Sequence, residues 1–193
     1  MDYFDEDTQL MLRFREGEES CFEQLVERHK NRVFRLAYRF LGNYQDAEDI
    51  AQEVFIKIYR ARNAYKPQAK FTTWLYVICK NICLKALCKR KPTPVSIDAS
   101  LELEEGTIAH QIIDLETPSP LGATLNNEQA LVVKKAIDSL PANQKMAVLL
   151  YRYDQLSYEE VAKIMSCSLR AVKSLLHRAK INLKERLTAY HKE

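Results

Sequence analysis

The stretch LSYEEVAKIMSCSLRAVKSLLHRAK, residues 156–180, most narrowly limits what this chain can fold into. Ser157 and, three residues later, Glu160 form a capping box, which satisfies two amide donors at the start of a helix. Apolar residues then recur at helical spacing until Ser166-Cys167-Ser168, where the residue types favour a turn and a second N-cap at Ser168. The stretch therefore predicts two helices joined by a short turn.

The second of these helices has two different faces. At about 100° per residue, one stripe is apolar and consists of Leu169, Val172, Leu176, Ala179, Leu183 and Leu187. The opposite side is polar and basic, with Arg170, Lys173, Ser174, His177 and Lys184. A short helix, a tight turn and a basic helix match the helix-turn-helix, whose second helix enters the major groove of DNA. A helical hairpin with a merely solvated basic face is the alternative.

Composition favours an all-α protein. The 193 residues leave room for one or two domains, and four Gly with 47% hydrophobic and 28% charged residues are typical of a mainly helical chain. No apolar run approaches the ~20 residues of a membrane span, and the acidic start MDYFDEDTQ lacks the features of a signal peptide. We therefore expect a cytoplasmic protein without membrane insertion.

Charge is strongly segregated along the chain. Residues 54–91 hold ten Lys or Arg and no acid, whereas residues 92–127 hold six acids, four prolines and no Lys or Arg. Residues 128–193 are basic again. This pattern predicts two small helical domains, 1–91 and 128–193, that face nucleic acid and are joined by an acidic linker at 92–127. The composition of the linker indicates that it is flexible.

The residues that could carry chemistry are scattered. Five cysteines include Cys79, Cys83 and Cys88 on one predicted helix, but no CxxC pair occurs and no His joins them. Free Cys is commonly a small core residue, so packing is favoured over a metal or redox role. No Gly-rich phosphate loop, HExxH or nucleophile elbow occurs. The sequence predicts no enzyme, no metal and no cofactor.

A helix predicted from Gln45 to about Arg62 carries a second surface of interest. Its buried stripe is Ala47, Ile50, Ala51, Val54, Phe55 and Ile58. A different sector holds Asp49, Gln52, Glu53 and Ile56 at spacings i, i+3, i+4 and i+7. An exposed apolar residue among polar ones can dock a partner protein, although a solvated helix face is the favoured alternative from the residues alone.

The segment FTTWLYVICKNICLKALCKRK predicts a largely buried helix, because it is apolar nearly all round. Thr72 or Thr73 can cap this helix, which runs to about Lys89. Tyr65, Lys70 and Phe71 lie in or beside the loop at its head, and Trp74, Asn81 and Lys85 fall within one sector of roughly 40° along the helix. Rings, amides and cations gathered in this way suit single-stranded nucleic acid with flipped bases. For Trp74, packing in the core and stacking on a base are equally compatible with the sequence.

Four blocks of the sequence together resemble a known family. DAEDIAQEVFIKIY at 46–59, FTTWLYVICKN at 71–81, SLP at 139–141 and the stretch at 156–180 resemble, in this order, the conserved blocks of bacterial sigma factors of the extracytoplasmic-function group. The resemblance covers both predicted domains. It implies a stress-response transcription initiation factor that binds core RNA polymerase, directs it to promoters and helps to open the DNA.

The resemblance also implies a role for individual residues. The largest-subunit clamp of the polymerase would be docked by Asp46, Asp49, Gln52, Glu53 and Ile56. The minus-ten promoter element would be bound by Lys70, Phe71, Thr72, Trp74, Asn81 and Lys85. The minus-thirty-five element would be read by Arg170, Lys173, Ser174, His177 and Arg178. Other faces of the second domain would meet the flap of the second-largest subunit, and an anti-sigma factor would mask these surfaces.

Four positions depart from the family pattern: Arg170, Ala171, Leu175 and Lys85. The family commonly has Gly-Thr-Val-Lys-Ser-Arg where this chain has residues 170–175, so Ala171 lacks a hydroxyl and Leu175 lacks a cation. Leu175 lies at the edge of the apolar stripe and can pack instead. Lys85 stands where an amide is frequent. The promoter preference therefore stays open, and two rivals remain: a stand-alone helix-turn-helix regulator, and a polymerase-binding regulator without promoter recognition.

Overall fold

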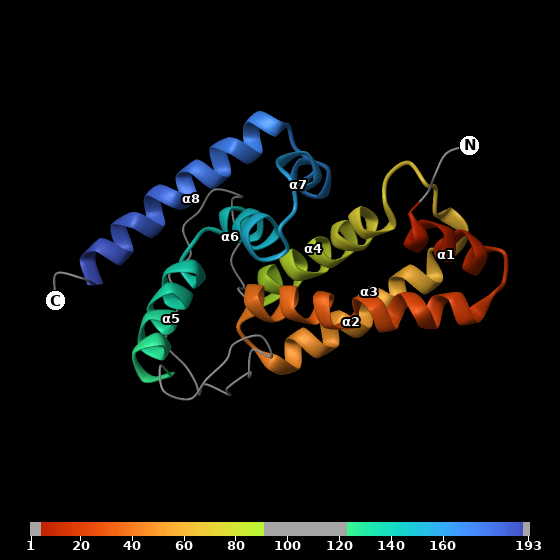
Figure 1. The fold of residues 1–193 in the computed structure, drawn as a ribbon, viewed down its shortest axis with the longest axis horizontal. Coiled ribbons are helices and arrows are strands. Elements are labelled where there is room, and N and C mark those ends of the chain that lie inside the picture. Colours follow the sequence, from red (N-terminus) through yellow and green to blue (C-terminus); the bar gives the residue numbers. More distant parts are fainter. Residues whose placement is uncertain (1–4, 91–122, 191–193) are drawn as a thin grey trace.

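The computed structural model describes residues 5–90 and 123–190, and every regular element within these ranges is a helix (Figure 1). The first domain consists of α1 (Glu6–Arg15), α2 (Glu19–Leu41), α3 (Tyr44–Arg60), the short 3-10 helix η1 (Arg62–Ala64) and α4 (Phe71–Arg90). The second consists of α5 (Ala123–Asp138), α6 (Ala142–Val148), the π-helical turn η2 (Leu149–Tyr153), α7 (Tyr158–Met165) and α8 (Leu169–Tyr190). The predicted all-α class is confirmed. The predicted linker lies outside the described residues up to 122, and α5 begins within its last positions.

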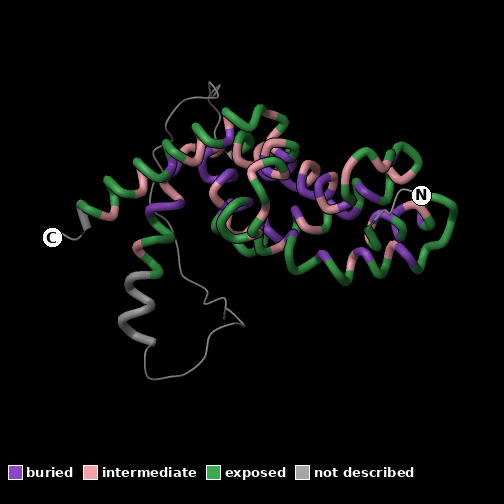
Figure 2. The backbone as a smooth tube through the Cα atoms, turned by 45° about the horizontal axis from the view of Figure 1, so that its top comes forward, coloured by how far each residue is buried: buried purple, intermediate pink, exposed green. Residues whose placement is uncertain are grey.

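The core of the first domain lies between α2, α3 and α4, with α1 against one end (Figure 1). The predicted stripe of α3 faces this core: Ala47, Ile50, Val54, Phe55 and Ile58 are buried and Ala51 is half-buried. On α2, the residues that face this core include Leu25, Val33, Leu36, Ala37 and Phe40, all of which are buried. Gly42 ends α2 in the left-handed region at φ 74°, and its N–H donates to the Tyr38 carbonyl over 2.8 Å. Residues that are buried therefore lie along the inner side of each helix (Figure 2).

Helix α4 is the core helix that its composition predicts, and Leu75, Tyr76 and Ile82 are buried. The stretch Phe71–Lys89 is nevertheless long enough, with a mean hydropathy of 1.2, to cross a membrane by length and composition alone. The expectation that no apolar run approaches this length was therefore wrong. The apolar residues have a local explanation, since α4 contacts α1, α2, α3 and α7 at once.

Two helix starts of the first domain show how their first amides are satisfied, and the start of α4 differs from the prediction. Asp5 caps α1 and accepts from the Thr8 N–H at 2.8 Å, because it stands one position before the first helical residue. Helix α4 already begins at Phe71, so neither Thr72 nor Thr73 is its cap. Both threonines lie inside the first turn, and the first amide of α4 is satisfied from α1 instead.

The second domain contains the predicted helix-turn-helix. Both capping-box bonds are present, from Glu160 N–H to Ser157 Oγ at 3.2 Å and from Ser157 N–H to Glu160 Oε2 at 3.0 Å. Ser166 ends α7 in the left-handed region at φ 54°, and Ser168 Oγ accepts from Ala171 N–H at 3.2 Å. Both predicted caps and the three-residue turn are confirmed.

The apolar stripe of α8 is only partly buried. Val172 and Ala179 are buried, while Leu176, Leu183 and Leu187 are half-buried. Leu169, at the start of the stripe, is 37% exposed. It is the first residue of the helix and lies next to the turn, where less of the domain is available to cover it.

The two domains contact each other, which the sequence does not predict. Tyr76 of α4 donates from its hydroxyl to Asp154 Oδ1 over 2.9 Å, and Lys145 of α6 donates to the Phe40 carbonyl over 2.8 Å. Helix α7 lies against α4, and η2 lies against α2. The described helices therefore form one body in which the helix-turn-helix adjoins α4 (Figure 1).

Candidate nucleic-acid and protein interfaces

The exposed sector of α3 is set by the cap at its start. Asn43 Oδ1 accepts from Asp46 N–H at 3.1 Å and fixes where the helix begins. With the apolar stripe turned inward, the side chains suspected of protein docking lie outward. Asp46 is half-buried, and those that are exposed are Asp49, Gln52, Glu53 and Ile56.

This sector combines charge with an apolar group. Ile56 is 48% exposed, whereas the other branched apolar side chains of α3, Ile50, Val54 and Ile58, are buried. Glu53 forms an ion pair with Lys57 over 3.1 Å, and both partners are about half exposed. An ion pair this exposed stabilises a helix only slightly, so Glu53 can exchange Lys57 for another cation at little cost.

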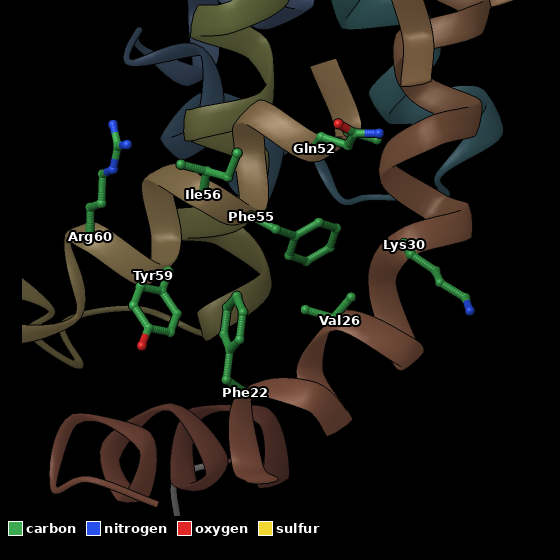
Figure 3. A pocket seen from close by; sticks show the side chains of 9 residues that line it. Phe22, Val26, Lys30, Gln52, Phe55, Ile56, Tyr59 and Arg60 are labelled. Atoms are coloured by element: carbon green, nitrogen blue, oxygen red, sulfur yellow. The ribbon is translucent and has the colours of Figure 1, made fainter. Parts of the chain in front are cut away.

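An apolar groove adjoins this sector, and the sequence did not reveal it. It lies between α2 and α3, has a volume of about 520 Å³, and takes Gln52 and Ile56 as part of its wall. Figure 3 shows the rings of Phe22 and Phe55 and the side chain of Val26 turned toward one another. The other residues of the wall are Lys30, Ala51, Tyr59 and Arg60.

The groove escaped prediction because periodicity does not separate a core from a groove. Phe22 and Val26 have the helical spacing of the buried residues of α2, yet both are only half-buried. Phe22 instead stacks on Phe14, with ring centroids 4.8 Å apart, and meets Tyr59 edge-on at 5.3 Å. A signal in the sequence is Tyr59, a large aromatic residue that directly follows Ile58, the last buried position of α3.

The head of α4 forms an aromatic cluster. Tyr65 and Phe71 are buried, at 2% and 0% exposure, and Trp74 is half-buried between them and the surface. The ring centroid of Trp74 lies 5.0 Å from that of Tyr65 and 6.2 Å from that of Phe71. Phe71 therefore supports the cluster from inside, and the indole of Trp74 is the part that reaches solvent.

The polar residues predicted beside this cluster are available at the surface. Lys70, Asn81 and Lys85 are exposed, and Thr72 is half-buried. Lys70 Nζ lies 3.4 Å from Glu160 Oε1 of the second domain. Hydrogen bonding from the Ser157 N–H, with a smaller effect of Lys70, lowers the pKa of Glu160, so this carboxyl is ionised at neutral pH.

The basic face of α8 is free of the core. All five residues suspected of reading DNA are exposed: Arg170, Lys173, Ser174, His177 and Arg178. Arg178 Nη2 donates to Ser174 Oγ over 3.2 Å, one turn earlier on the same helix. Leu175 is half-buried, which agrees with its expected place at the edge of the apolar stripe.

The cysteines show no arrangement for chemistry. In the ranges 5–90 and 123–190, no three His, Cys, Asp or Glu side chains come together as metal ligands. Cys79 and Cys83 are buried in α4, whereas Cys88 is exposed, and all three are free thiols. A hydrogen bond with the neighbouring Cys83, together with burial, raises the pKa of Cys79, which keeps this thiol protonated.

Both domains match family models of known proteins. Residues 25–93 match the family model for sigma-70 region 2, and residues 130–183 match the model for sigma-70 region 4. The chain is 34% identical over 179 residues to the RNA polymerase sigma-H factor of Pseudomonas aeruginosa, covering 91% of each chain. It is 35% identical over 176 residues to the ECF sigma-E factor of Escherichia coli, covering 90% of each. It is also 31% identical over 173 residues to SigW of Bacillus subtilis, covering 90% of this chain and 92% of SigW.

Solved structures show the same fold. The complex of CnrH with the cytosolic domain of CnrY aligns with a TM-score of 0.69 at 20% identity, covering 96% of this chain and 99% of that chain. The sigma factor RpoE of Bartonella quintana, solved with the anti-sigma factor NepR, aligns with a TM-score of 0.64 at 22% identity, covering 86% and 96%.

Sigma factors are non-enzymatic initiation factors that bind core RNA polymerase and direct it to promoters. Matches to regions 2 and 4, in the order of the two domains, and identities above 30% over nine-tenths of the chain leave no other assignment. The chain belongs to the extracytoplasmic-function group of the sigma-70 family of RNA polymerase sigma factors.

Proposed function

We propose that this sigma factor divides promoter initiation among three surfaces: the exposed sector of α3 docks the polymerase, the head of α4 opens the DNA, and α8 reads the upstream element. The observation that carries the proposal is that α8 exposes five residues able to contact DNA while its caps fix the helix against α7. Such a helix fits the major groove.

The docking surface would bind the largest-subunit clamp of core polymerase. Asp49, Gln52 and Glu53 supply polar contacts around the exposed Ile56, and such an apolar anchor within a polar rim is typical of protein interfaces. The apolar groove adjoins the same anchor and would extend the surface toward α2. Asp46 lies in the first turn of α3, at the edge of this surface.

The head of α4 would hold the minus-ten element where the duplex opens. The half-buried indole of Trp74 can stack on a flipped base, because an aromatic ring stacks on the face of any base. Lys70 would then leave Glu160 for a phosphate, while Thr72, Asn81 and Lys85 would contact the strand along α4. Phe71 supports the cluster from inside. Trapping of flipped bases drives the opening, so no nucleotide hydrolysis is needed.

The second domain would bind the minus-thirty-five element. Arg170, Lys173 and Arg178 carry charge toward phosphates and base edges, and Ser174 and His177 add hydrogen-bonding groups between them. Other faces of the same domain would meet the flap of the second-largest polymerase subunit.

We also propose an anti-sigma factor as a partner and the cytoplasm as the place of action. The support is that solved structures with this fold include complexes with the cytosolic domain of CnrY and with the anti-sigma factor NepR. Promoter DNA and core polymerase, the partners that the function requires, are found in the same compartment.

Paired substitutions test the division of labour. Asp49→Ala with Gln52→Ala should weaken binding of core polymerase at least several-fold, and Trp74→Ala should leave that binding unchanged while it slows promoter opening. Glu23→Ala with Gln24→Ala is the matched control, since these residues are an exposed acid and amide on α2 outside the groove. Polymerase binding is measured by fluorescence anisotropy and opening by permanganate reactivity of the promoter. Normal run-off transcription by both variants would contradict the assigned surfaces.

A further inference from the structure

Helix α1 contacts the loop at 65–70 at both of its ends. At the start of the loop, Arg15 Nη1 donates to the Tyr65 carbonyl over 3.3 Å. At its end, the Phe71 N–H donates to Thr8 Oγ1 over 3.1 Å. The loop and α1 lie side by side beyond the head of α4 (Figure 1). This short helix, which none of the three proposed surfaces uses, therefore brackets the segment that leads into the opening site.

The contact with Thr8 is buried and replaces a missing cap. The first amides of a helix have no partner within the helix, and α4 begins at Phe71 directly after the loop. Thr8 is 1% exposed and Phe71 0%, so water cannot satisfy this amide if the hydroxyl is removed. A residue 63 positions earlier in the chain thus caps α4.

Helix α1 is itself held firmly enough to act as a support. Asp5 caps it at the Thr8 N–H, so the backbone of Thr8 is fixed as well as its side chain. Asp7 Oδ2 lies 2.8 Å from His29 Nε2, and Asp7 Oδ1 accepts from Arg28 Nη1 at 3.1 Å. The ring of His29 in turn lies 5.6 Å from that of Phe71. These contacts link α2 to α1 and both helices to the head of α4.

We infer that Thr8 is a positioning residue for promoter opening: its hydroxyl fixes the first turn of α4 and so the orientation of Trp74 toward a flipped base. The inference rests on the proposed role of the α4 head. Thr8 is buried and touches no nucleic acid itself. Arg15 supports the other end of the same loop, so loss of its contact should have a similar but smaller effect, because that bond is longer and only partly buried.

The chain offers a direct probe of this inference, because Trp74 is its only tryptophan. Thr8→Val keeps the shape of the side chain and removes the hydroxyl, whereas Thr8→Ser keeps the hydroxyl. Thr8→Val should shift the Trp74 emission maximum and increase its quenching by acrylamide, and Thr8→Ser should match the unchanged protein. This measurement uses the full chain alone and does not depend on the proposed function.

The functional test measures promoter opening by the holoenzyme on two DNA templates. Thr8→Val should slow opening of a duplex promoter about fivefold, the factor that corresponds to loss of a typical N-cap bond. On a template already unpaired at the minus-ten element the defect should largely disappear, and Thr8→Ser should restore opening on the duplex. A substitution that merely lowers the fraction of folded protein would reduce activity on both templates equally, and this result would overturn the inference.

Arg15→Met keeps the test valid if Thr8→Val folds poorly. Arg13→Met is its control on the same helix, because Arg13 pairs with Glu18 and not with the loop. Arg15→Met, but not Arg13→Met, should alter Trp74 quenching and duplex opening. An unchanged Trp74 signal in both Thr8→Val and Arg15→Met would overturn the positioning role. Normal opening by Trp74→Ala with altered signals in those two variants would instead contradict the proposed function of the site.

Discussion

In the proposed function, single residues of α8 determine how strongly and how selectively this sigma factor holds DNA. Lys173 matches the family pattern and is exposed on the outer face of the helix. Ala171 and Leu175, which depart from that pattern, are half-buried, so the structure turns both of them partly toward the protein. The residues left to read sequence are therefore the charged and polar ones around Lys173.

Lys173→Ala should weaken promoter binding and reduce its dependence on salt. Each phosphate contact releases counterions and contributes about −0.9 to the slope of log K against log salt concentration, so the slope should become shallower by about this amount. Arg186→Ala is the control, since Arg186 is exposed on α8 roughly 140° around the helix from Lys173. Anisotropy titrations of promoter DNA with holoenzyme at several salt concentrations give both slopes. An unchanged slope for Lys173→Ala would show that this residue does not contact phosphate.

At the scale of elements, the sequence predicted what local chemistry decides and missed what distant contacts decide. The starts of α7 and α8 followed from Ser157 and Ser168, because each cap bonds to an amide three residues away. The predicted start of α4 was wrong because the Phe71 amide, the first of the helix, is satisfied by Thr8, and no local sequence pattern connects Thr8 with Phe71. The apolar groove was missed for the same reason, since the neighbours of Phe22 come from other helices.

Ser157→Ala should destabilise the helix-turn-helix by about 1 kcal/mol, the typical cost of losing an N-cap. The loss follows because the Glu160 amide loses its acceptor, Ser157 Oγ, whereas the reciprocal bond from the Ser157 backbone N–H to Glu160 Oε2 does not involve the serine side chain. Ser20→Ala, at an exposed helical position of α2, should have little effect and serves as the control. Urea denaturation followed by circular dichroism measures both changes. Equal stability of the two variants would contradict the role of the capping box.

At the scale of the whole molecule, the main result is the contact between the domains. Asp154 of the second domain accepts from the Tyr76 hydroxyl, and burial raises the pKa of Asp154 while Tyr76, Arg32, Arg39 and Arg35 lower it to a lesser extent. The contact could not be predicted from the sequence, because each domain buries its own core and no periodic pattern marks Tyr76 or Asp154 as partners. The proposed reading of two separate promoter elements requires each domain to expose its DNA face. In this arrangement α8 exposes its five candidate residues, whereas the head of α4 is partly covered, since Trp74 is half-buried and Lys70 pairs with Glu160 of the second domain.

The domain contact should strengthen as the pH falls. Because the pKa of Asp154 is raised in the closed arrangement, this arrangement binds the proton more tightly, so closure is favoured below the ordinary pKa and weakened as the pH rises through the raised value. Asp154→Asn mimics the protonated group and should stay closed with little dependence on pH. Small-angle X-ray scattering of both proteins between about pH 7 and 4 measures the radius of gyration. Equal pH dependence in the two proteins would exclude Asp154 as the group responsible.

The division of labour among α3, α4 and α8 is tested most directly by the transcripts that the chain itself starts. The purified protein is mixed with sigma-free core polymerase and total genomic DNA, and the 5′ ends of the transcripts are sequenced. We predict discrete start sites that share two upstream elements, and loss of these starts with Trp74→Ala. Polymerase binding without discrete starts would contradict the account and favour a regulator that lacks promoter recognition, whereas DNA binding without polymerase binding would favour a stand-alone regulator.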